Sequence, residues 1–169
     1  MNKALFLDRD GIINVDRHYV HTAEEFIFVP GIFELCHRAI DLGYKIIVIT
    51  NQSGIERGYF TEEEFLKLTR WMEDRFLSRG VTISKVYYCP SLSGNDRKPN
   101  PGMFLKARDE FRLDLTASRS LGDQDRDIEA ARRAGVGMNI LLVSNKTVDT
   151  QAIVADKIIT SLREMENLL

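Results

Sequence analysis

The stretch Ala4-Leu5-Phe6-Leu7-Asp8-Arg9-Asp10-Gly11 decides the fold of this chain. Its apolar half predicts a short buried strand, and the glycine predicts a turn directly after two carboxylates. Like charges one residue apart are costly unless a cation lies beside them. Carboxylate oxygens suit Mg²⁺, which takes one or two protein carboxylates and completes its coordination with water and phosphate oxygens. The stretch therefore predicts half of a metal and phosphate site at the end of a strand.

Length and composition are those of a single globular domain. The chain has 169 residues, of which 44% are hydrophobic and 28% charged, and we expect residues 1–169 to form one domain. The formal net charge is −2 and the sequence contains no basic block, so a nucleic acid is not an expected partner.

Cysteine content and hydropathy indicate the compartment. Cys36 and Cys89 are too few for a disulfide framework, which favours a reducing compartment. We find no signal-peptide pattern and no apolar run of membrane-spanning length. The expectation is a cytoplasmic protein without a membrane partner.

Strand-like and helix-like patterns alternate along the chain. The predicted strands are Ala4–Leu7, Lys45–Ile49, Lys85–Tyr88, Ser118–Leu121, Asn139–Val143 and Lys157–Ile159. The predicted helices run from Gly31 to a cap at Gly43, from a capping box at Thr61 and Glu64 through Phe76, from an N-cap at Asn100 with Pro101 as first residue, and from Asp125 to Ala134. This alternation predicts an α/β fold, a Rossmann-like, doubly wound and mostly parallel sheet with helices on both faces and no separate cap domain.

Ligands of such sheets bind beyond the carboxyl ends of the strands. Each of four predicted strands is followed there by polar side chains: Asp8-Arg9-Asp10-Gly11, Thr50-Asn51-Gln52-Ser53-Gly54, Arg97-Lys98-Pro99, and Asp123 with Asp127. Carboxylates, a hydroxyl and a cation at one edge are the parts that a phosphoryl-transfer site requires.

The four motifs, in this order, resemble the haloacid-dehalogenase-like (HAD) phosphohydrolases. The resemblance is closest to the branch of the D-glycero-D-manno-heptose 1,7-bisphosphate phosphatases and the related histidinol-phosphate phosphatases, and it covers roughly residues 3–143. Further matching motifs are Ile55, Arg57-Gly58, Tyr88-Cys89-Pro90, Pro101-Gly102-Met103 and Gly122-Asp123.

The resemblance implies a role for each motif residue. Asp8 would be the nucleophile that forms an aspartyl-phosphate, and Asp10 the general acid and base. Thr50 and Lys98 would contact the transferring phosphoryl group and balance its charge. Asp8, Asp10 (through its backbone carbonyl) and Asp123 would hold Mg²⁺, with Asp127 in a second shell that orients a metal-bound water or Lys98. Positions that contact substrate in the family are matched by Asp16, Arg17, His18, Tyr19, Asn51, Gln52, Ser53, Arg97 and Gln124.

Structural roles compete with some of these functional ones. Asp127 lies in the first turn of a helix, where the dipole favours an acid for structural reasons alone, so both readings stay open. His18, His21 and His37 lack ligand spacing and are expected to be surface or packing residues. Trp71 falls off the apolar stripe of its helix, and the pattern does not place it.

The chain departs from the pattern of the branch at four places. Many members carry a zinc loop with four ligands, whereas here Cys89 stands alone before a short loop, so no structural zinc is expected. Ile12 replaces a threonine, His18 stands where glycine is common, and Gln124 replaces a frequent lysine. The last two changes leave the identity of the substrate open.

The function that these observations favour is a Mg²⁺-dependent phosphomonoesterase. The resemblance implies removal of the 7-phosphate of heptose 1,7-bisphosphate, in a cell-envelope or glycan precursor pathway of a bacterium, by a monomer. Rival enzymes are a histidinol-phosphate phosphatase and a polynucleotide 3′-phosphatase. A rival of another class is a signalling receiver domain, which expects its acceptor aspartate on a middle strand rather than the first.

Overall fold

The computed structural model describes residues 1–144 and 154–169. Six strands form one sheet in the order β3-β2-β1-β4-β5-β6, and every neighbouring pair is parallel. The strands are β1 (Lys3–Leu7), β2 (Tyr44–Asn51), β3 (Ile83–Cys89), β4 (Arg119–Gly122), β5 (Met138–Leu142) and β6 (Lys157–Ile159). All six predicted strands are confirmed, with small shifts at their ends.

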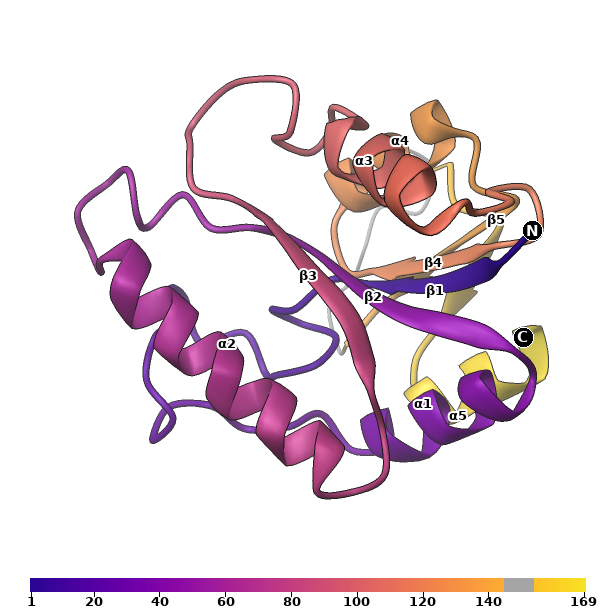
Figure 1. The fold of residues 1–169 in the computed structure, drawn as a ribbon, viewed down its shortest axis with the longest axis horizontal. Coiled ribbons are helices and arrows are strands. Elements are labelled where there is room, and N and C mark those ends of the chain that lie inside the picture. Colours follow the sequence, from indigo (N-terminus) through magenta and orange to yellow (C-terminus); the bar gives the residue numbers. More distant parts are fainter. Residues whose placement is uncertain (145–153) are drawn as a thin grey trace.

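Helices cover both faces of the sheet (Figure 1). They are α1 (Ile32–Asp41), α2 (Glu62–Leu77), α3 (Gly102–Phe111), α4 (Asp125–Ala134), α5 (Leu162–Met165) and the 3₁₀ turn Glu166–Leu168. Helices α3 and α4 pack on one face, while α1, α2 and α5 lie on the other. The expected α/β sheet with helices on both faces is therefore confirmed.

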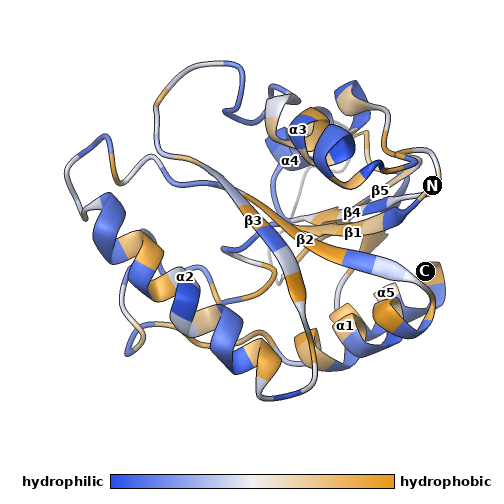
Figure 2. Ribbon diagram, viewed as in Figure 1, coloured by the Kyte–Doolittle hydropathy of each residue, from blue (hydrophilic) through white to orange (hydrophobic). Residues whose placement is uncertain are grey.

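The alternation of side chains along β1 supplies both cores. Leu5 and Leu7 join the core under α1, α2 and α5, whereas Ala4 and Phe6 join the core under α3 and α4. Figure 2 shows the apolar residues of the helices gathered toward the central strands. A strand buried on both faces must be apolar throughout, which is why this short run predicted the centre of the sheet.

Helix ends follow local signals, with one exception. The capping box of Thr61 and Glu64 is present, and Gly135 closes α4 in a left-handed conformation. The expected N-cap at Asn100 is wrong, because α3 begins at Gly102 and its N-cap is Pro101. The amide of Asn100 instead donates to the carbonyl of Gly94 at 2.9 Å, which closes the preceding loop on itself.

Trp71 belongs to an aromatic group between α2 and the loop before α1. Its ring lies 5.4 Å from that of Phe26 and 5.9 Å from that of Phe28, measured between centroids. The long segment between β1 and α1 supplies these phenylalanines, so the indole packs against a loop rather than against the sheet. None of the helices in the described residues has the length and apolar character needed to cross a bilayer.

Candidate active site

The carboxyl ends of three strands meet at one point of the sheet. Leu7 of β1 is level with Val48 of β2 on one side and with Leu121 of β4 on the other. The chain runs from β1 to β2 and β3 in one direction and then crosses to β4 in the other, so strand order reverses beside β1. Such a switch point is where open α/β sheets bind ligands. The residues that follow these strands, with Asp8 first, are delivered to it.

Lys98 ties two carboxylates together below the surface. Its Nζ lies 3.1 Å from Oδ1 of Asp8 and 2.6 Å from Oδ1 of Asp127, and it donates to the carbonyl of Ile49 at 2.9 Å. The side chains of Lys98, Asp127 and Asp8 are only 2%, 7% and 11% exposed. A buried charge requires a partner, and here one ammonium serves two carboxylates.

Burial and neighbouring charges shift the titration of this cluster. Burial raises the pKa of Asp8 well above its usual range, and Asp127 raises it further while Lys98 opposes the shift. Burial lowers the pKa of Lys98, but Asp127 and Asp8 raise it by more, so that it ends above its ordinary value. The ammonium of Lys98 therefore stays charged, whereas the carboxyl group of Asp8 keeps its proton to a higher pH than an ordinary aspartate does.

The start of helix α4 positions the aspartates on one side of the site. Oδ2 of Asp127 accepts hydrogen bonds from the backbone N–H groups of Asp123 at 3.2 Å and Gln124 at 3.0 Å, which leaves Oδ1 for Lys98. Gly122 permits this approach, since a Cβ there would lie 2.3 Å from Cβ of Asp127. Asp127 therefore has both roles that the sequence left open. It caps the N-terminus of α4, and it contacts Lys98.

The carboxylates of Asp8 and Asp123, beside that of Asp127, fit a hard divalent cation. One oxygen each from Asp8, Asp123 and Asp127 lies within 4.8 Å of the others. Oδ1 of Asp123 is buried with no hydrogen-bond partner among the described residues, and burial together with the charge of Asp127 raises its pKa to about 7. A Cβ at Gly11 would lie 2.1 Å from Oδ2 of Asp123, so only glycine leaves this carboxylate its place. A carboxylate oxygen without a hydrogen-bond partner, in a cluster of negative charge, is the kind of ligand that Mg²⁺ prefers.

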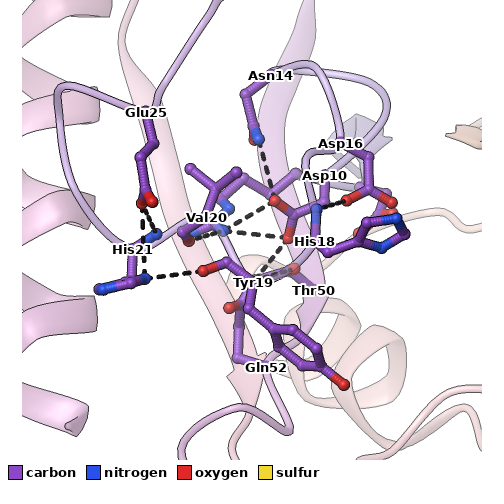
Figure 3. Close-up of polar contacts among 12 residues, drawn as sticks. Asp10, Asn14, Asp16, His18, Tyr19, Val20, His21, Glu25, Thr50 and Gln52 are labelled. Atoms are coloured by element: carbon purple, nitrogen blue, oxygen red, sulfur yellow. Dashed lines mark hydrogen bonds and ion pairs between the residues drawn. The ribbon is translucent and has the colours of Figure 1, made fainter. Parts of the chain in front are cut away.

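The carboxylate of Asp10 lies apart from that cluster and accepts from three side chains (Figure 3). Its donors are Arg9 at 2.8 Å, Asn14 at 3.0 Å and Gln52 at 2.9 Å. The same Nε2 of Gln52 lies 3.0 Å from the hydroxyl oxygen of Thr50. A contribution of Asp10 to a metal through its backbone carbonyl stays a prediction.

Arg9 is a part of the site that sequence reasoning missed. It is 1% exposed, and its Nη2 bridges the carboxylate of Asp10 and the carbonyl of Val20, the latter at 2.7 Å. Its guanidinium carbon lies 5.9 Å and 5.8 Å from the ring centroids of Phe26 and Phe65. Arg9 therefore joins the general-acid candidate to the loop that carries residues 16–20. The sequence did contain a signal for this role, because Arg9 lies between Asp8 and Asp10 and is the cation nearest to both in the chain.

Two adjoining pockets open at the strand ends. The inner pocket has a volume of about 50 Å³ and contains the carboxylate cluster with Lys98. The outer pocket, about 230 Å³, extends from Asp10 into the loops. The substrate-contact candidates that line one or both pockets are Asp16, His18, Tyr19, Asn51, Gln52, Ser53, Arg97 and Gln124. Arg57, which the sequence offered only as part of a matching motif without a role, and Arg126, which it did not single out, also line the outer pocket.

Two expected substrate contacts differ from the rest. Arg17 is exposed and lines neither pocket. Asn51 lines both, but its amide exchanges hydrogen bonds with the backbone of Lys98, at 3.1 Å from Nδ2 and 3.0 Å to Oδ1. Asn51 therefore fixes the position of the lysine in addition to facing the pocket.

The loop that follows Cys89 is the place where the sequence led us to expect no structural zinc. Sγ of Cys89 contacts the carbonyl of Ser91 at 3.7 Å, and among the described residues the one carboxylate, cysteine and histidine group close enough for a metal is that of Asp8, Asp123 and Asp127. The absence of structural zinc stays a prediction.

Comparison with known proteins places the chain among phosphatases. A family model described as "HAD-hyrolase-like" matches residues 95–165. The D-glycero-alpha-D-manno-heptose-1,7-bisphosphate 7-phosphatase of Burkholderia mallei is 44% identical over 97% of this chain and 92% of its own. The D-glycero-beta-D-manno-heptose-1,7-bisphosphate 7-phosphatase of Vibrio cholerae is 42% identical over 98% and 95%. The crystal structure of D,D-heptose 1,7-bisphosphate phosphatase from B. bronchiseptica, complexed with magnesium and phosphate, superposes with a TM-score of 0.86 at 25% identity over 98% and 97% of the two chains.

Proposed function

The chain belongs to the HAD-like phosphohydrolases, in the family of the D-glycero-D-manno-heptose-1,7-bisphosphate 7-phosphatases, and we propose that it removes the 7-phosphate of that sugar bisphosphate. The observation that carries the proposal is the buried contact of Lys98 Nζ with Asp8, at 3.1 Å, beside Asp127 and the partnerless oxygen of Asp123. This arrangement supports the proposal, because it puts the residue expected to be the nucleophile beside a fixed cation and a carboxylate that can bind a metal.

In the first chemical step, a carboxylate oxygen of Asp8 attacks the phosphorus, and the bond to the sugar oxygen breaks. Lys98 faces Asp8 and counters the charge that gathers on the phosphoryl oxygens, while the hydroxyl of Thr50 donates to one of them. Asp10 gives a proton to the departing alcohol. Its position depends on Arg9, Asn14 and Gln52, whose hydrogen bonds hold the carboxylate at the border of the two pockets.

In the second step, Asp10 takes a proton from a water molecule, whose oxygen attacks the phosphorus of the aspartyl-phosphate. The bond between phosphorus and Asp8 then breaks, and inorganic phosphate leaves. When bound, Mg²⁺ neutralises phosphate charge, and Asp8, Asp123 and the backbone carbonyl of Asp10 would hold it. Asp127, whose Oδ1 lies 2.6 Å from Nζ of Lys98, holds the lysine in position for both steps.

A turnover assay with three substrates tests the proposal. Phosphate release is measured from heptose 1,7-bisphosphate, histidinol phosphate and a 3′-phosphorylated oligonucleotide, and the phosphate retained on the sugar is located by ³¹P NMR. We expect the highest kcat/KM for the bisphosphate and a product that carries its phosphate at C1. A higher kcat/KM for either rival substrate, or phosphorylation that stops after one equivalent as in a receiver domain, would overturn it.

A further inference from the structure

The outer pocket contains more positive charge than the inner one. Three guanidinium groups line it, those of Arg57, Arg97 and Arg126, against the carboxylates of Asp10 and Asp16. The charge of Asp10 is already paired with the buried Arg9. The inner pocket is the reverse, with five aspartates against Lys98 and Arg126. A substrate with a phosphate at each end would meet metal-binding carboxylates at one end and arginines at the other.

Arg126 holds a special place among these arginines. It is the one basic residue of the described chain that lines both pockets. It lies in the first turn of α4, directly before Asp127, so the capping contacts of Asp127 fix the backbone that carries it. A side chain at this position borders the path from the reacting phosphate to the loops.

The guanidinium of Arg126 is also free for a ligand. It makes no hydrogen bond or ion pair within residues 1–144 and 154–169, and the side chain is exposed. Arg97, in contrast, is half-buried and donates from Nη1 to the carbonyl of Ser91 at 3.2 Å, within its own loop. Of the two, Arg126 keeps all of its donors for a bound anion.

We propose that Arg126 is a specificity-determining residue that binds the phosphate that is not cleaved. The proposal rests on the proposed function, because it needs a substrate with two phosphates. Gln124, at the N-cap of α4, carries no charge, and Arg126 supplies a cation from the first turn of that helix. Arg97 and Arg57 complete the group of donors around the phosphate from the opposite loops.

The test compares Arg126→Gln with a rescue variant and a charge control. The rescue variant is Arg126→Gln combined with Gln124→Lys, which returns one positive charge to the same turn. The control is Arg133→Gln, which removes a charge from the exposed, opposite end of α4, where Arg133 pairs with Glu129. For each protein we would measure kcat/KM for both anomers of heptose 1,7-bisphosphate and for p-nitrophenyl phosphate. Calorimetry would give the Kd of the monophosphate product, which carries only the phosphate in question.

Arg126→Gln should lower kcat/KM for the bisphosphate by roughly 10-fold or more, as expected for a charged hydrogen bond. Its loss with p-nitrophenyl phosphate should be at least about 5-fold smaller, since that substrate has no second phosphate. Product binding should weaken by the same factor as bisphosphate turnover, the rescue variant should regain part of both, and the control should match the unaltered protein.

Two outcomes would overturn the inference. Equal losses on both substrates would mean that Arg126 serves the reacting phosphate or the fold, and an unchanged Kd for the product would mean that it binds no second phosphate. Failure of the proposed function looks different, because the unaltered protein would itself show no preference for the bisphosphate over p-nitrophenyl phosphate.

Discussion

The inner and outer pockets adjoin, but they are built in different ways. The inner pocket is lined mainly by residues that follow strand ends and by the start of α4, with Asp16 and Lys98 supplied by loops. Its central residue, Lys98, is 2% exposed and has three partners. The outer pocket is lined mainly by loop residues, together with Arg126 of α4, and Tyr19 on its wall is 42% exposed. Groups that perform a reaction gain from rigid, desolvated surroundings, whereas groups that choose a substrate can sit on loops that vary. The difference predicts that changes in the inner pocket affect every substrate and changes in the outer pocket affect only some.

The largest effect is expected from Asp8→Asn in the inner pocket. An amide is a far poorer nucleophile than a carboxylate and removes a negative charge from the metal site, so turnover of every phosphomonoester should fall below detection. Steady-state phosphate release would measure it, with circular dichroism to show that the fold is retained. Near-normal turnover would refute the assignment of the nucleophile.

Asp10→Asn, at the border of the two pockets, should cost less. Loss of a general acid and base lowers kcat by on the order of 10²–10⁴. The new amide would also present an NH₂ group to the donors of Arg9, Asn14 and Gln52. The loss should shrink for p-nitrophenyl phosphate, whose leaving group needs little protonation. If kcat/KM, which reports the steps up to loss of the alcohol, falls equally for an alkyl and a nitrophenyl ester, Asp10 does not protonate the leaving group.

Arg97→Ala tests the outer pocket. The side chain reaches this pocket while one donor is held by Ser91, and removing it should weaken turnover of the bisphosphate by roughly 1.5–3 kcal/mol, the range of a charged hydrogen bond. The effect on p-nitrophenyl phosphate should be much smaller. Ratios of kcat/KM for the two substrates measure it, and identical losses would place Arg97 with the inner pocket instead.

Asp123→Asn should stabilise the metal-free protein. Burial and Asp127 raise the pKa of this carboxyl from 3.8 to about 7, so the folded state binds its proton more tightly than the unfolded chain does. Stability of the metal-free protein therefore falls as the pH rises between these two values. The asparagine removes that cost, and at pH 8 in chelator the melting temperature should rise by about 2–8 °C, equivalent to about 1–2 kcal/mol.

The control for this experiment is Asp125→Asn, two residues further along the chain, in the exposed first turn of α4. It removes the same charge but should not raise the melting temperature, since an acid in a first turn is favourable. A lower melting temperature for Asp123→Asn at pH 8, or an equal rise in both variants, would show that the buried charge of Asp123 does not destabilise the metal-free protein.

The smallest effect is expected on the stability of the fold when metal ions are removed by a chelator. With Cys89 as the single thiol before the loop, elemental analysis should find no stoichiometric zinc, and the fold should survive a chelator, unlike that of a domain held by zinc. Turnover should stop in chelator and return with Mg²⁺. One zinc per chain, or a melting temperature that collapses in chelator, would contradict this expectation.

Local patterns predicted most of the fold because each depends on near neighbours. The apolar run before Asp8 reads as a strand wherever it lies, and the capping box at Thr61 and Glu64 involves a single turn. The prediction at Asn100 failed for the opposite reason, because its amide is used by the loop that returns to Gly94. A local pattern cannot show whether the side chain of Asn100 will cap the helix or bind the loop, because that depends on how the loop folds.

The sequence by itself also determined which residues reach the strand ends. Parallel strands bring their carboxyl ends to one edge, so the order of the motifs was enough to predict that Asp8, Lys98 and Asp123 lie together, and all three line the inner pocket. Spacing does not tell which way a loop side chain points. Arg17 lies in the segment expected to contact substrate and lines neither pocket, whereas Arg126, which drew no attention, lines both.

Only the tertiary structure decided the partners of the charged groups. Lys98 lies 90 residues from Asp8 in the chain, yet burial in one pocket forces them into contact. Arg9 follows Asp8 directly but turns to Asp10, Val20 and two phenylalanine rings. A buried charge must take whatever partners the packed chain offers, and those partners come from segments far apart in sequence. For that reason the chemistry of the site follows from the motifs, while its electrostatics follow from the fold.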